Sequence, residues 1–150
     1  MNPPLRTNVI LMADDDADDR LLAKDAMNEA QMGGELRFVE NGEELLDYLR
    51  RRGPYANGAS VPRPSLILLD LNMPKMDGRE ALRAIKADPD LRRIPVVMLT
   101  TSKADTDINS LYELGVNSFI TKPFQFDVLV KVMRMVGDYW LKTVELPGPK

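Results

Sequence analysis

The most constraining feature of this sequence is an apolar run at residues 66–69 that ends directly on a carboxylate, Asp70. A run this apolar is typical of a strand buried on both faces of a parallel sheet. Residues 71–78 follow with proline, aspartate and glycine, which stop a strand and favour a turn. Asp70 is therefore predicted to lie at the carboxyl end of a central strand, where open α/β sheets bind their ligands.

Apolar runs that end on polar residues recur along the chain and alternate with helical patterns. The expected strands are residues 9–13, 35–39, 66–70, 95–100 and 118–121, and the expected helices are residues 17–30, 43–52, 79–88, 106–114 and 126–141. In the first helix, Leu21, Leu22, Met27 and Ala30 are expected to face the core. This alternation predicts an α/β fold with right-handed crossovers and helices on both faces of a parallel sheet. Of the orders it allows, a doubly wound, flavodoxin-like order 2-1-3-4-5 fits the chain length.

The residue types of the chain limit its chemistry. Its 150 residues suit one domain, and they include no histidine and no cysteine. These absences exclude a nucleophile activated by histidine, thiolate chemistry and zinc sites that need imidazole. The net charge of −3 gives no reason to expect binding to nucleic acid or to an anionic membrane. Without a signal-peptide pattern or a membrane-spanning run, a cytoplasmic location is the default expectation.

Polar side chains converge at the predicted carboxyl ends of four strands. These residues are Asp14 and Asp15, Asp70, Thr100 and Lys122. Three carboxylates brought this close together repel one another unless a cation joins them. Oxygen ligands without histidine or cysteine favour a hard ion, so we expect Mg²⁺, with Mn²⁺ as the other candidate. Lys122 and Thr100 add an ammonium group and a hydroxyl, both suited to a phosphoryl group.

Four stretches of the chain resemble the receiver domain of two-component response regulators. They are ILMADDD, ILLDLNMPKMDG, VVMLTTS and FITKPF, which occur in the order and spacing of that family across about residues 8–137. The resemblance implies that residues 1–150 form a single receiver domain, with residues 138–150 as a C-terminal extension. It also implies a phosphoacceptor signalling domain and not an enzyme, beyond self-phosphorylation and self-dephosphorylation.

The resemblance assigns roles to individual residues. Asp70 is the phosphoacceptor, and Lys122 contacts the phosphoryl oxygens. Asp15 and Asp70 ligate Mg²⁺ directly, together with the backbone carbonyl of Asn72, whereas Asp14 acts through water. The absence of histidine is consistent with this reading, because the donor histidine then belongs to a partner kinase.

Two further features follow from the same resemblance. Thr100 and Phe119 form a coupled switch pair, in which Thr100 swings toward the phosphoryl group and Phe119 turns inward. The peptide bond between Lys122 and Pro123 is expected to be cis.

The loop at residues 53–64 and the tail at residues 138–147 resemble the single-domain regulators that serve phytochrome-type sensor kinases. This narrower resemblance implies a light-sensing histidine kinase as partner. It also implies a homodimer through the helices at residues 106–114 and 126–141 and the tail. Trp140 at the end of the last helix fits such a contact, because exposed aromatic residues favour interfaces.

Three other functions compete with this reading. An aspartate-nucleophile phosphatase needs an acid two residues after Asp70, where this chain has Asn72. A flavin mononucleotide carrier needs a loop that accepts a phosphate dianion, which the acids at residues 14–16 repel. A binding module that never takes phosphate is the third.

Asp16, Asp18 and Asp19 are interpreted as helix-start residues, and the step from Asp77 to Gly78 as a turn.

Overall fold

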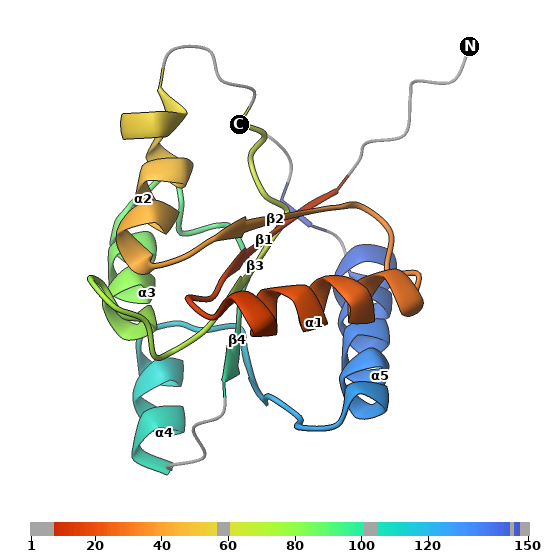
Figure 1. Cartoon of the computed structure of the whole chain (residues 1–150). Coiled ribbons are helices and arrows are strands. Elements are labelled where there is room, and N and C mark those ends of the chain that lie inside the picture. The colour runs from red at the N-terminus through yellow and green to blue at the C-terminus, as the bar shows by residue number, and fades with distance from the viewer. Residues whose placement is uncertain (1–7, 57–60, 101–104, 145, 148–150) are drawn as a thin grey trace.

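The computed structural model describes residues 8–56, 61–100, 105–144 and 146–147, and its strands form one parallel sheet (Figure 1). The strands are β1 (Val9–Ala13), β2 (Glu35–Val39), β3 (Leu66–Leu69), β4 (Val96–Thr100) and β5 (Ser118–Thr121). Their spatial order is β2-β1-β3-β4-β5, which confirms the predicted order. β1 and β3 therefore lie side by side, in a register that pairs Ala13 with Leu69.

Helices connect the strands and cover both faces of the sheet. They are α1 (Ala17–Glu29), α2 (Gly42–Arg50), α3 (Gly78–Ala87), α4 (Asp105–Glu113) and α5 (Phe126–Gly137). Side-chain caps start three of them: Asp16 for α1, Asn41 for α2 and Asp77 for α3. The predicted last helix is α-helical only to Gly137, and a π-helical turn at Asp138–Thr143 continues it. The step from Asp77 to Gly78, interpreted as a turn, is the capped start of α3.

Alternating side chains of the inner strands supply two apolar cores, one on each face of the sheet. Leu11, Ile67 and Met98 point to the face covered by α2, α3 and α4, which Figure 1 shows on one side of the sheet. Met12 and Leu68 point to the opposite face, which α1 and α5 cover. Because β1, β3 and β4 are buried on both faces, their sequences read as continuous apolar runs.

The prediction that Leu21 and Leu22 face the core is wrong. Their side chains are 58% and 46% exposed, whereas α1 buries Ala23, Ala26 and Met27 instead. A helix turns by about 100° per residue. Relative to the buried face of α1, Leu22 therefore lies at the side of the helix and Leu21 lies nearly opposite. Both leucines are therefore exposed apolar residues of α1.

The connection between α2 and β3 is partly built into the fold. A 3₁₀ turn at Gly53–Tyr55 follows α2, and residues 57–60 lie outside the described ranges. Val61 and Pro64 are buried, which differs from the expected surface loop. The Tyr48 hydroxyl donates to the Pro62 carbonyl oxygen at 2.9 Å and ties this segment to α2.

None of the helices within the described ranges has the length and apolar character that a membrane-spanning segment needs.

Candidate functional site

The carboxyl ends of β1 and β3 bring acidic residues together at one edge of the sheet. The Asp14 amide donates to the carbonyl oxygen of Val39 at 3.1 Å, and the Asp70 amide donates to that of Ala13 at 3.0 Å. These bonds extend the strand pairing by one residue past each strand. Asp70 is therefore fixed directly beside the end of β1.

Asp14, Asp15 and Asp70 form a cluster whose carboxylate oxygens can approach a common point. One oxygen of each side chain lies within 4.8 Å of the others. Asp14 is fully buried, Asp70 is partly buried and Asp15 is exposed, so the cluster opens to solvent on one side. Asn72, in the turn that follows, is exposed as well. Three oxygen donors with mutual repulsion are the donor set that a hard divalent cation fits.

Lys122 closes the buried side of the cluster. Its ammonium group lies 2.8 Å from an oxygen of Asp14 and 3.2 Å from an oxygen of Asp19, and its side chain is 11% exposed. Burial alone lowers the pKa of Lys122, but the hydrogen bond and charge of Asp14, then the charges of Asp70 and Asp19, outweigh it and raise that pKa. Lys122 is therefore a charged counter-ion held within reach of the cluster.

Asp19 is a site residue that the sequence interpretation missed. Asp16 and Asp18 match that interpretation, because Asp16 caps α1 by accepting the amides of Asp18 and Asp19, and Asp18 is exposed. Asp19 contacts Lys122 as well. No local sequence signal marks this role, because the contact depends on how the first turn of α1 lies over the sheet.

The turn between β3 and α3 is packed too tightly for larger residues. The Gly78 amide donates to the Leu71 carbonyl oxygen at 2.8 Å, and a Cβ atom at Gly78 would collide with the backbone carbonyl of Asp70. The Gly42 amide at the start of α2 donates to the Met76 carbonyl oxygen at 2.9 Å, and a Cβ there would lie 2.5 Å from that oxygen. The two glycines hold the turn beside the acidic cluster.

Thr100 and Phe119 lie on the neighbouring strands. The backbone of Thr100 ends β4 and pairs with Thr121, while its side chain lies outside what the structure describes. Phe119 is partly buried and packs against the core under α2, α3 and α4. The expected cis bond between Lys122 and Pro123 is wrong, because no peptide bond in the described ranges is cis.

Comparison with known proteins gives the same family as the motifs. The family model of the response regulator receiver domain matches residues 10–134. Response regulator Rcp1 of Synechocystis is 43% identical over 147 residues, which cover 98% of this chain and 96% of Rcp1. The crystal structure of the phosphorylated cyanobacterial phytochrome response regulator RcpA is 42% identical and superposes with a TM-score of 0.87, covering 95% of this chain and 100% of RcpA.

A second solved structure, the Mn²⁺-bound form of response regulator Rcp1, is 42% identical with a TM-score of 0.85 and covers 94% of this chain and 99% of that one. These similarities run along nearly the whole chain and include the segments that carry the acidic cluster and Lys122. The chain therefore belongs to the response regulator receiver domain family.

Proposed function

We propose that this chain is a single receiver domain that takes a phosphoryl group from a sensor histidine kinase onto Asp70. One observation carries the proposal: oxygens of Asp14, Asp15 and Asp70 lie within 4.8 Å of one another, while Lys122 is ion-paired to Asp14. Such an arrangement can accept a highly anionic group only if positive charge balances it. Lys122 supplies part of that charge, and a divalent cation supplies the rest.

The donor set fits Mg²⁺, with Mn²⁺ as the alternative. Asp15 and Asp70 would hold the ion directly with the backbone carbonyl of Asn72, and Asp14 would act through water. When bound, the ion neutralises negative charge on the phosphoryl oxygens of the transition state. The chemistry of the donors supports this assignment, because the described cluster offers only oxygen.

Asp70 is the nucleophile in this proposal. Its carboxylate oxygen attacks phosphorus, the P–N bond to the donor imidazole breaks, and the imidazole nitrogen keeps the electron pair. The donor histidine belongs to the kinase, since this chain contains none. Lys122 then exchanges part of its contact with Asp14 for the new phosphoryl oxygens.

Phosphorylation changes the β4–β5 side of the domain through Thr100 and Phe119. Thr100 donates its hydroxyl to the phosphoryl group, and Phe119 turns into the space that Thr100 leaves. Thr100 and Phe119 lie on adjacent strands, because β4 and β5 pair Met98 with Phe119 and Thr100 with Thr121. This proximity supports the proposed coupling. The added charge at Asp70 would thereby favour one of two conformations of the surface around β4 and β5.

The test of the proposed function is covalent labelling. The full chain, incubated with Mg²⁺ and acetyl phosphate, is expected to gain the mass of one phosphoryl group, and EDTA is expected to prevent the gain. Intact-protein mass spectrometry measures both results. No gain with Mg²⁺, at a concentration and time that label a known receiver domain, contradicts the proposal.

A phytochrome-type kinase is the proposed partner, and an apolar patch beside the site supports a protein donor. Leu22 is 46% exposed and lines a small cavity with Lys122 and Asp19, while Phe124, two residues past Lys122, is 89% exposed. Exposed apolar residues this close to a reactive site favour docking of another protein. The similarity to the phytochrome response regulator RcpA supports the choice of kinase.

Leu22→Asp should therefore separate docking from chemistry. We expect transfer from an autophosphorylated bacterial phytochrome kinase to slow by about tenfold or more, because a charge enters the apolar contact. Labelling by acetyl phosphate should slow far less, because this small donor needs no contact with α1. Radiolabel transfer measures the first rate and intact mass the second. Ala87→Asp, at an exposed position on α3, is the control; equal transfer rates for both variants contradict this docking surface.

We further propose a homodimer through α4, α5 and the C-terminal tail. A groove of about 630 Å³ runs along edge strand β5 and α5 and is lined by Ile120, Val132 and Trp140 among others. Met135 and Tyr139, which also line it, are 63% and 54% exposed. An apolar surface of this kind next to a sheet edge supports burial against a second copy.

Tyr139→Asp is expected to convert that dimer into a monomer, because a carboxylate would be buried at the contact. Sedimentation velocity over a range of protein concentrations, with and without acetyl phosphate and Mg²⁺, measures the outcome. Leu21→Asp is a matched control, since it places the same charge on an exposed apolar residue of α1. A wild-type protein that stays monomeric in both states rejects this part of the proposal.

A further inference from the structure

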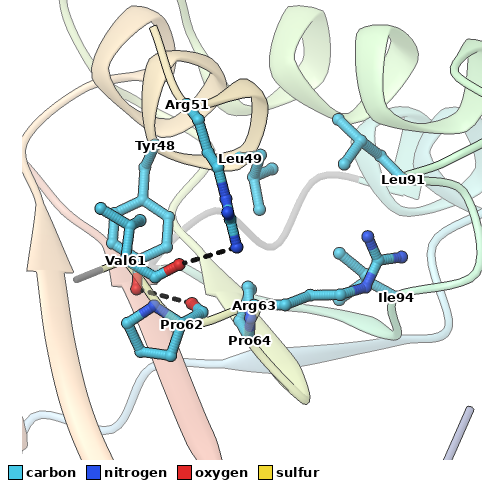
Figure 2. Close-up of a pocket in the computed structure, with 9 residues that line it drawn as sticks. All are labelled: Tyr48, Leu49, Arg51, Val61, Pro62, Arg63, Pro64, Leu91 and Ile94. Carbon is cyan, nitrogen blue, oxygen red and sulfur yellow. Dashed lines mark hydrogen bonds between the residues drawn. The ribbon is translucent and has the colours of Figure 1, made fainter. Parts of the chain in front are cut away.

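A second cavity lies at the edge of the sheet opposite the acidic cluster. Its volume is about 300 Å³, and it is enclosed by the end of α2, the segment that precedes β3 and the turn that precedes β4 (Figure 2). These lining segments lie at the amino ends of β3 and β4, whereas Asp70 lies at the carboxyl end of β3. The size is at the lower end of the range for small-molecule sites, about 300–1,000 Å³.

The apolar part of the cavity wall is fixed. Val61, Leu91 and Ile94 are 8%, 3% and 3% exposed, so these side chains belong to the core and form a firm surface. The hydrogen bond from the Tyr48 hydroxyl to the Pro62 carbonyl oxygen holds the segment that precedes β3 against α2. A pocket of this kind needs little rearrangement to accept an apolar group.

Two arginines supply the polar part of the wall. Arg51 reaches down from the end of α2 and donates to the Val61 carbonyl oxygen at 3.4 Å (Figure 2). Arg63 donates to the carbonyl oxygen of Asp90. These carbonyl groups orient the guanidinium groups but carry no net charge. None of the nine side chains that line the cavity is acidic. The lining therefore combines two positive charges with an apolar floor.

We propose that this cavity binds a small organic anion, with a carboxylate or phosphate group on Arg51 and Arg63 and a compact apolar body against Val61, Leu91 and Ile94. Guanidinium groups bind both head groups through paired, charge-assisted hydrogen bonds. The apolar walls select for a ring or branched chain of limited size. This site is separate from the phosphoacceptor site and does not depend on the function proposed for it.

The experiment follows backbone amide signals of the ¹⁵N-labelled full chain by NMR, in EDTA so that no metal recruits the probe to Asp70. Benzoate and phenyl phosphate are the two probes, and the tighter of them identifies the head group. Saturable shifts at Val61, Leu91 and Ile94 are expected. Benzyl alcohol, inorganic phosphate and acetate, which each lack one half of the ligand, should bind about tenfold more weakly or worse.

Variants test whether the arginines carry the binding. Arg51→Gln and Arg63→Gln should each weaken the tighter probe by about tenfold, and Arg63→Lys should retain part of the affinity. Arg134→Gln on α5 removes the same charge elsewhere and should change nothing. Amide spectra without probe confirm the fold of each variant. Absence of shifts at the lining residues, equal binding of benzyl alcohol, or unchanged affinity in both Gln variants overturns the proposal.

Discussion

Asp70→Asn is expected to abolish the covalent uptake of a phosphoryl group from acetyl phosphate. The amide has nearly the shape of the carboxylate but lacks the nucleophilic oxygen, so the domain stays folded and the acceptor is lost. Removal of one of three clustered negative charges should also raise the free energy of unfolding in metal-free buffer by about 1 kcal/mol. Intact mass and urea denaturation measure the two effects.

Asp77→Asn is the matched control for this substitution. Asp77 lies in the same turn and caps α3 by accepting the Glu80 amide at 2.9 Å. Asparagine caps helices about as well as aspartate, so this variant should remain folded and be phosphorylated like the parent chain. Phosphorylation of the Asp70→Asn chain at another carboxylate, or loss of labelling in both variants, would contradict the role given to Asp70.

Lys122→Ala is expected to lower the free energy of unfolding by about 3 kcal/mol in metal-free buffer. The substitution leaves the fully buried Asp14 carboxylate without its counter-ion, 2.8 Å away in the parent chain. Urea denaturation measures the loss. The double variant with Asp14→Asn should recover most of it, because the stranded charge is then gone as well.

Lys142→Ala provides the comparison for Lys122. Lys142 pairs with Asp138 on the surface, where both side chains are more than half exposed, and its removal should cost less than about 0.5 kcal/mol. A similar small loss for Lys122→Ala would mean that the buried pair does not stabilise the fold.

The contribution of Lys122 should also depend on pH in one direction. Its pKa in the folded chain lies above the usual 10.5, so the stabilisation is fully present below that value and is lost as the pH rises through the folded pKa. The difference between the parent chain and Lys122→Ala should therefore stay constant from neutral pH to about pH 10 and decrease above it. A difference that falls already near neutral pH would contradict this assignment.

The central part of the candidate site could be predicted from the sequence, because each of its residues ends an apolar strand. Asp14, Asp15 and Asp70 are adjacent once β1 pairs with β3, and the predicted strand order 2-1-3-4-5 contains that pairing. Asp19 could not be assigned in the same way. Its contact with Lys122 depends on how α1 sits over the sheet, which local sequence does not determine.

The face of α1 and the arginine-lined cavity required the structure for different reasons. Leu21 and Leu22 are apolar by type, yet the helical period sets them apart from Ala23, Ala26 and Met27. Helix α1 buries two small alanines while two larger leucines are exposed, and residue hydrophobicity alone would predict the reverse. The cavity arises from three segments distant in sequence. Only their folding against one another places two guanidinium groups beside an apolar floor.

The close contact of Gly42 with Met76 has a mechanical consequence. The first residue of α2 is hydrogen-bonded to the turn that follows Asp70, and there is no free space between them. Helix α2 is a short rod whose other end, at Arg51, borders the second cavity. A shift of that turn would therefore have to move the first residue of α2 as well, and the nine residues of this helix connect the two opposite ends of the sheet.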